Sequence, residues 1–263
     1  MRTIKTHSWR KQQGISLLIV LILLLLTIAA VTGAFRVANI SEAFTGSNSD
    51  YQRTYAAAEA LMQDAEIDVR GRLPPYTTVQ ADGLVGTPCK PSTADPLLTQ
   101  SGFFGCRRAD STVPWFPRSS EDFDVIADIV NGTGSARSCL QGICIPTSPT
   151  FYSPAIENDL STMLAVGAYY GQYTGTSPGS VTSNPVLTSN TSAPYARYWV
   201  EVLPYTTAPA NSTTSMNPLA EDLRPDKTLP YVYRITVVAQ GLKAGSRVVL
   251  KSVFVPSPLS QNK

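Results

Sequence analysis

A run of apolar residues near the N-terminus constrains this 263-residue chain more than any other feature. The run extends from Ile15 to Phe35 and contains no charged residue. As an α-helix with a rise of 1.5 Å per residue it is about 30 Å long, the hydrocarbon thickness of a lipid bilayer. Inside lipid a single segment satisfies its backbone hydrogen bonds only as a helix, so the run predicts a transmembrane helix over 15–35.

A short basic segment precedes the apolar run and ends at Gly14. Residues 1–14 contain four Lys and Arg and no acid, which favours a cytoplasmic N-terminus with the remainder of the chain outside. Three interpretations compete: a cleaved secretory signal, an ordinary single-pass anchor, and a leader cut after Gly14 that leaves the apolar helix on the mature protein. The run exceeds the roughly 7–15 residues of a signal's hydrophobic region, which disfavours the first interpretation.

The helical pattern continues beyond the apolar run. No proline occurs before Pro74, and Gly71 can end a helix, so we expect one helix over 15–70. Its second half is amphipathic, with a weak point expected at 46–49 and an apolar stripe of Val37, Ile40, Phe44, Tyr51, Tyr55, Ala58, Met62, Ala65 and Val69. We expect this stripe to pack against the chain's own globular domain. The opposite, polar face comprises Arg36, Glu42, Arg53, Glu59 and Asp64.

Residues 71–263 are expected to form a loop-rich extracytoplasmic head. Ser119, with Asp122 three residues later, predicts a helix with a capping box that ends at 131–132. A second helix is expected to begin at Ser153–Pro154 and to end near 169–171. Trp115-Phe116-Pro117 is expected to cover a small core, and 174–194 and 206–218 are expected to be surface loops.

Three alternating segments near the C-terminus predict β-strands. They span 197–203, 231–238 and 247–255, and 241–245 joins the last two as a hairpin. An antiparallel sheet laid on the amphipathic half of the long helix is an α+β fold. The expected organisation is therefore a leader over 1–14, a helix over 15–70, and a head over 71–263.

The chain contains four cysteines, all beyond the apolar run: Cys89, Cys106, Cys139 and Cys144. An even count in an exported domain predicts disulfides rather than a metal site, because that compartment is oxidising and neither close pair has the CxxC spacing. Three connectivities are possible. We favour pairing by proximity, Cys89 with Cys106 and Cys139 with Cys144.

Composition excludes several classes of function. The single histidine, His7, lies in the leader, so the remainder lacks the histidine that Ser-His-Asp and Cys-His arrangements and His-containing zinc sites need. Without the leader, 17 Lys and Arg face 19 Asp and Glu, so there is no basic footprint for nucleic acid. Acids at 121, 122, 124 and 128 invite a calcium interpretation, but favourable placement at a helix N-terminus explains them better. No cofactor and no enzymatic activity are predicted.

The segment Lys11-Gln12-Gln13-Gly14-Ile15-Ser16-Leu17-Leu18 resembles the processing site of type IV pilin precursors. In that family a prepilin peptidase cuts after the glycine and usually methylates the new N-terminus, which implies cleavage between Gly14 and Ile15 and N-methyl-Ile15. Most major pilins carry a glutamate five residues into the mature chain, which pairs with a neighbouring subunit. That position is Ile19 here, a departure typical of tip subunits.

Tyr55-Ala-Ala-Ala-Glu59-Ala-Leu61 and Arg197-Tyr-Trp-Val-Glu201 resemble segments of PilX-type minor pilins. This resemblance implies a minor pilin in a tip complex that primes pilus assembly and supports a PilY-type adhesin, with roles in adhesion and twitching motility. Its implied partners are other minor pilins and the major pilin, through the N-terminal helix. The implied location is the inner membrane before assembly and the pilus tip afterwards.

Alternative functions remain at this stage. A tip pseudopilin of a type II secretion system also lacks the glutamate, although that family usually has a larger helical insert and a calcium site. A single-pass anchored binding module would keep residues 1–14. A membrane-anchored enzyme would need a Ser-Lys or carboxylate-pair mechanism, for which no residues are nominated.

Overall fold

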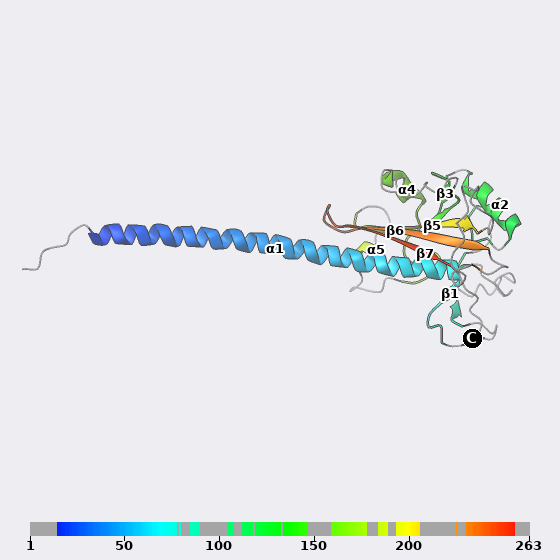
Figure 1. The fold of residues 1–263 in the computed structure, drawn as a ribbon, viewed down its shortest axis with the longest axis horizontal. Helices are drawn as coiled ribbons and strands as arrows, with labels where there is room; N and C mark the ends of the chain where they lie inside the picture. Colours follow the sequence, from blue (N-terminus) through cyan, green and yellow to red (C-terminus); the bar gives the residue numbers. More distant parts are fainter. Residues whose placement is uncertain are drawn as a thin grey trace, which may run out of the picture. The chain divides into compact units, whose positions relative to one another are not determined.

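The structure is a computed structural model that describes residues 15–77, 79, 85–89, 105–107, 112–117, 119–132, 134–146, 159–177, 184–188, 193–205, 225 and 230–255. The predicted leader and Gly14 lie outside these residues. The chain divides into two compact units, Met1–Ser49 and Asp50–Lys263 (Figure 1). The second unit holds the sheet and the hydrophobic core, and it is called the head below.

One α-helix, α1, extends from Ile15 to Arg70, as the sequence predicts. It continues without interruption through 46–49, where Gly, Ser and Asn weaken helical propensity, and the boundary between the two units falls directly after this segment. Among the described residues, α1 is the one helix long and apolar enough to cross a membrane. At the other end Gly71 takes a positive φ of 77°, and its N–H bonds the Ile67 carbonyl at 2.7 Å to close the last turn.

A five-stranded sheet forms the centre of the head. Its order is β3 (Cys139–Leu140), β4 (Ile143–Cys144), β5 (Tyr195–Pro204), β6 (Tyr231–Gln240) and β7 (Arg247–Phe254). The three long strands pair antiparallel, which confirms the predicted antiparallel sheet. The sheet as a whole is mixed, because β4 pairs parallel with β5. A separate two-stranded sheet joins β1 (Arg72–Leu73) and β2 (Thr87–Pro88).

The two faces of the sheet carry different contacts. The α1 side buries Tyr198, Val200 and Val202 of β5 in one cluster with Leu61 and Ala65 of α1. The other side buries Trp199 and Val238 with Met163 and Val166 of α4, which spans Leu160–Val166. The period-two alternation expected for a two-sided sheet thus places successive β5 residues in two different clusters.

The predicted helix at 119–131 is α2, Ser120–Val130. Ser119 Oγ accepts from the Asp122 N–H at 3.1 Å, and the Asp122 carboxylate accepts from the Ser119 N–H at 3.3 Å, so the predicted capping box is present. Ile126 and Val130 of α2 are fully buried. Phe116 is also buried, so the aromatic cluster at 115–117 covers the core as expected.

Two local predictions are wrong. The helix expected to reach 169–171 ends at Val166, because Gly167 turns into extended backbone and the chain bridges to β5 through Ala168 and Tyr198. The expected loop over 174–194 contains a short helix, α5, at Pro185–Thr188. Its Val186 is buried in the core, and this tertiary contact outweighs the loop-like composition of the segment.

Candidate functional site

The N-terminal half of α1 presents an uncovered apolar surface. Every residue from Ile15 to Thr45 is exposed, including Ile15 and Ile19, the predicted N-terminal and glutamate-replacing positions. A helix that is apolar on all sides is stable only in lipid or among other apolar helices. This half of α1 is therefore a membrane-compatible or helix-packing segment.

The C-terminal half of α1 is buried along a face that was predicted only in part. Ala58, Met62, Ala65 and Val69 are buried as expected. The other members of the predicted stripe are instead exposed: Val37, Ile40, Phe44, Tyr51 and Tyr55. The polar residues Asp50 and Thr54 take the place of the two tyrosines against the head. The physical reason is space, because a Cβ on Gly241 would lie 2.4 Å from Thr54 Oγ1. Only a small side chain fits where the β6–β7 hairpin crosses the helix.

Three aspartates on this half of α1 bind segments that are distant in sequence: Asp50, Asp64 and Asp68. All three are almost completely buried. Asp64 was expected on the polar, outward face, and that prediction is wrong. Buried carboxylates need hydrogen-bond or charge partners, so each aspartate marks a point where a loop or strand is attached to the helix.

Asp50 holds the turn between β6 and β7. Its carboxylate accepts from the N–H of Leu242 at 3.2 Å and from the N–H of Lys243 at 2.9 Å. Burial acts to raise the pKa of Asp50, but these N–H donors, the Ser246 side chain and the charge of Arg53 together outweigh it, and the pKa lies below its ordinary value. The ionised form is therefore the one that binds the hairpin.

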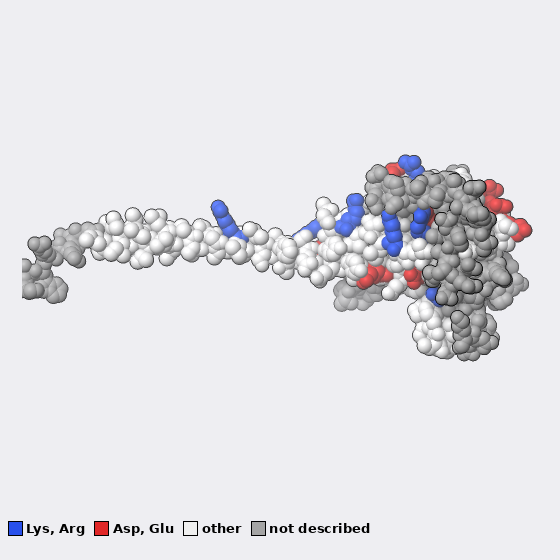
Figure 2. Space-filling model, viewed as in Figure 1, with Lys and Arg blue, Asp and Glu red and all other residues white. Residues whose placement is uncertain are grey.

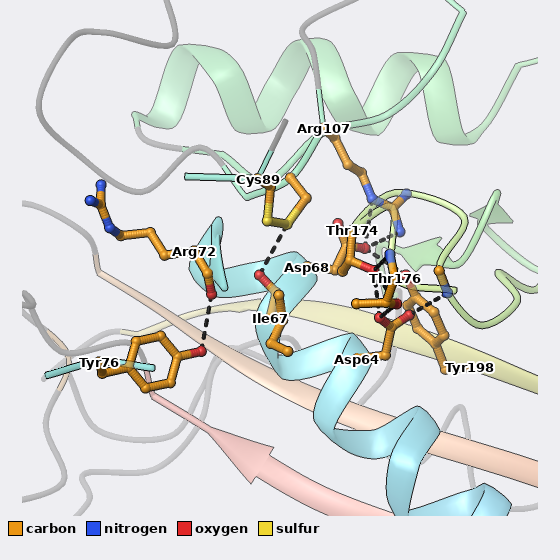
Figure 3. The surroundings of a disulfide bond; sticks show 12 residues. Asp64, Ile67, Asp68, Arg72, Tyr76, Cys89, Arg107, Thr174, Thr176 and Tyr198 are labelled. Atoms are coloured by element: carbon orange, nitrogen blue, oxygen red, sulfur yellow. Dashed lines mark hydrogen bonds and ion pairs between the residues drawn. A yellow bond between two sulfur atoms is a disulfide. The ribbon is translucent and has the colours of Figure 1, made fainter. Parts of the chain in front are cut away.

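Asp64 holds the loop that follows α4. It accepts from the hydroxyls of Thr174 and Thr176, at 2.5 and 2.7 Å, and from the N–H of Gly171 at 2.8 Å (Figure 3). Burial raises the pKa of the Asp64 carboxyl, and the three donors offset part of that effect. All three donors belong to the segment 171–176, so a single side chain orders the loop.

Asp68 forms a buried ion pair with Arg107, which was not predicted. Asp68 Oδ2 accepts from Arg107 Nε at 2.9 Å, from Arg107 Nη2 at 2.7 Å and from the Tyr198 hydroxyl at 2.7 Å (Figure 3). The Arg107 guanidinium also lies 3.7 Å from the centre of the Tyr173 ring. Burial acts to lower the pKa of Arg107, but Asp68 and the nearby Tyr198 and Tyr173 together outweigh it, so the pKa lies above its ordinary value and the guanidinium stays charged.

The Cys89–Cys106 disulfide joins two segments that cap the C-terminus of α1. The Cys106 N–H bonds the Asp68 carbonyl at 2.7 Å, and the Cys89 N–H bonds the Gly71 carbonyl at 3.0 Å. The Cys106 sulfur lies 3.2 Å from the Ile67 carbonyl oxygen, a contact rather than a hydrogen bond because a disulfide sulfur carries no hydrogen (Figure 3). Carbonyls that a helix end leaves without intrahelical partners are thus satisfied by a cross-linked loop.

The second disulfide, Cys139–Cys144, closes the β3–β4 hairpin. Both pairs are those that proximity in the sequence favours. No strand is predicted over 139–144, so the entry of this hairpin into the sheet beside β5 was missed. Positive φ angles at Gln141 and Gly142 form the turn, and Gly142 lies so close to Ala168 that a Cβ would be 2.6 Å away.

Glu201 and Arg234 form an ion pair across β5 and β6. The guanidinium donates to both carboxylate oxygens, and the Glu201 side chain is 1% exposed while that of Arg234 is 27% exposed. Burial raises the pKa of Glu201 to about 7, although Arg234 acts in the opposite direction. This pair lies on the sheet face away from α1.

The described residues contain no group of three or more His, Cys, Asp and Glu that could hold a metal ion. The acids of α2 serve other roles, since Asp122 completes the capping box and Asp124 is exposed. Tyr170 and Tyr173 are half-buried and pack against the core. The distinctive features are therefore the exposed apolar helix and its polar attachment to the head.

Comparison with known proteins identifies the region that contains the sheet. A family model described as "Type IV pilus assembly protein PilX C-term" matches residues 106–256, which is 151 of the 263 residues. No curated protein and no solved structure matches the chain. The matched region begins at the cysteine that caps α1 and includes every strand from β3 to β7.

Proposed function

Because the chain belongs to the PilX family of type IV pilus assembly proteins, we propose that this minor pilin joins a complex at the pilus tip, primes polymerisation of the major pilin and supports a PilY-type adhesin. The observation that carries the proposal is the exposed apolar surface of Ile15–Phe35, continuous with a helix attached firmly to the head. PilX proteins are structural pilus components, so the chemistry required of this chain is assembly rather than catalysis.

In the proposed mechanism the apolar part of α1 leaves the lipid bilayer and packs among the apolar helices of other pilins. Prepilin peptidase cleaves after Gly14 and methylates Ile15, while the apolar helix holds the protein in the inner membrane with the head in the periplasm. The helix then moves into a bundle with the helices of other minor pilins and the major pilin. Lipid contacts are replaced by helix contacts at little net cost, because lipid tails and leucine side chains are similarly apolar.

The tip position is supported by Ile19. The usual glutamate pairs with a neighbouring subunit, and Ile19 offers no charge for that pairing. No acid occurs in the chain before Glu42, so no nearby residue replaces it. A subunit without this interaction is best placed where no further subunit is added, directly beneath the adhesin.

The first experiment tests processing of the full-length protein in a piliated host. Gly14→Ala should block cleavage and leave a species heavier by the leader, and protein from sheared wild-type pili should begin with N-methyl-Ile15. Gly33→Ala is the matched control, because a Cβ at Gly33 meets nothing within 4 Å. Normal processing of Gly14→Ala would contradict the pilin mechanism.

A second experiment tests the location. Gold-labelled antibody against the head should mark one end of each pilus. Labelling along the length would contradict the tip position while leaving the pilin class intact. Ile19→Glu should then allow some copies to enter the shaft, and labelling of the variant should extend away from the end.

A further inference from the structure

The β7 strand ends the sheet with an open edge. It pairs with β6 over eight successive positions, from Gln240↔Arg247 to Tyr233↔Phe254, without an interruption in register. Among the described residues, no strand pairs with its other side. In an antiparallel pair, alternate residues direct their N–H and C=O groups outward, so about half of the backbone groups of β7 face away from β6.

The surroundings of this edge are strongly basic. Residues 227–263 contain six Lys and Arg and no Asp or Glu. Figure 2 shows Lys and Arg side chains gathered over β6 and β7. Arg247 and Lys251 are exposed on the sheet face away from α1, and Arg234 of the neighbouring strand is partly exposed on the same face.

Two acids of the described residues, one on this face and one on α1 at the hairpin, are already engaged. Glu201 forms the ion pair with Arg234 and also attracts Lys251, and Asp50 binds the backbone of the hairpin. The face is not purely polar, since Val253 is 50% exposed beside these cations. An extended segment laid along β7 would thus meet alternating cationic and apolar side chains.

We propose that the β7 edge, defined here as Arg247–Phe254, binds an extended acid-rich segment of another protein as an added strand. Main-chain hydrogen bonds would supply affinity, and the alternation of charge and apolar surface would select the sequence. A second copy of this chain is disfavoured, because pairing two such edges would bring Arg247 and Lys251 of both copies together. Lys and Arg on edge strands are a common protection against self-pairing, and here the same charges favour an acidic partner.

The test uses full-length protein in detergent micelles and a labelled eight-residue peptide of alternating Glu and Val with blocked ends. The acidic peptide should bind and should slow hydrogen exchange of the outward β7 amides. A peptide with Lys in place of Glu should not bind. The acidic peptide carrying N-methyl groups on alternate residues keeps its charge but cannot form strand hydrogen bonds, and it should lose both effects.

Two single-charge variants in the same hairpin sharpen the test. Lys251→Gln should weaken binding by about two- to fivefold, the range for one exposed charge pair. Lys243→Gln, in the exposed turn before β7, should leave binding unchanged. The proposal is overturned if the N-methylated peptide binds equally well, if the outward β7 amides are already protected in the free protein, or if the protein self-associates through this edge. It stands independently of cleavage after Gly14.

Discussion

The Asp68 carboxylate and the Arg107 guanidinium lie 2.7 Å apart with both side chains fully buried. Arg107 also donates to the Gln141 carbonyl at 2.8 Å, so one cation connects α1 to the β3–β4 turn. Asp68 Oδ1 is buried and accepts no hydrogen bond from the described residues. The buried carboxylate is therefore stabilised only by the donors to Oδ2, which come from Arg107 and Tyr198.

Replacing Arg107 with alanine should therefore lower the free energy of unfolding by about 3–5 kcal/mol, because it leaves the buried Asp68 carboxylate without its cation and with only the Tyr198 hydroxyl as a donor. Denaturant unfolding followed by the fluorescence of the buried Trp199 measures the change in full-length protein. Arg137→Ala is the control, since its pair with Asp159 is exposed and should contribute little. Equal effects of the two variants would contradict the role given to Arg107.

Glu201 gives stability a specific pH dependence. Its folded pKa of about 7 exceeds the ordinary 4.5, so between these values the folded state holds a proton that the unfolded state has released. Stability from this group is present below pH 4.5 and falls as the pH rises toward 7, by up to about 1.4 kcal/mol per pH unit. Glu201→Gln should flatten that slope in unfolding curves from pH 4.5 to 7. An unchanged slope would show that Glu201 ionises normally.

Gly105 is predicted to tolerate no side chain. It has a φ of 69°, and a Cβ would lie 2.4 Å from the Phe116 ring and 2.6 Å from the Asp68 carbonyl oxygen. Gly134 has a similar φ of 85° with nothing within 4 Å, so Gly134→Ala should show only the conformational cost of about 1–2 kcal/mol. In thermal unfolding, Gly105→Ala should have a clearly lower melting temperature than Gly134→Ala. Similar melting temperatures of the two variants would mean that Gly105 does not lie this close to Phe116 and the Asp68 carbonyl.

Two apolar residues on α1 should respond differently to truncation. Leu61 is fully buried against the sheet, so Leu61→Ala should cost about 2–5 kcal/mol. Tyr55 is exposed, and Tyr55→Ala should leave the unfolding midpoint essentially unchanged. The same denaturant series distinguishes them. A large loss of stability in Tyr55→Ala would show that Tyr55 packs against the head, as the predicted apolar stripe requires.

Sequence patterns predicted the parts of this fold that depend on neighbours in the chain. The capping box at Ser119 and Asp122, the three long strands and the extent of α1 all follow from local periodicity and chemistry. The two disulfides follow from short loop lengths, which proximity alone favours.

The wrong predictions for α1 concern positions whose burial is decided by contacts with residues distant in the sequence. Tyr51 and Tyr55 fit an apolar stripe, but the close approach of Gly241 admits only Thr54 at the contact. Asp64 is placed on the solvent-facing side because its partners, Thr174 and Thr176, are at least 110 positions away in the sequence. The ion pair of Asp68 was missed because Arg107 is 39 positions away. No local pattern contains that information, and charged residues on a predicted helix face are ordinarily exposed.

The spacing of Asp50, Asp64 and Asp68 has a mechanical consequence. From Asp50 to Asp68 the helix rises about 27 Å at 1.5 Å per residue. A force drawing the helix lengthwise out of the head would load all three carboxylate attachments in shear together, at the hairpin, the loop after α4 and the Arg107 segment. Tension carried by α1 would thus be shared among separate polar anchors, and slippage would require them to rupture nearly at once.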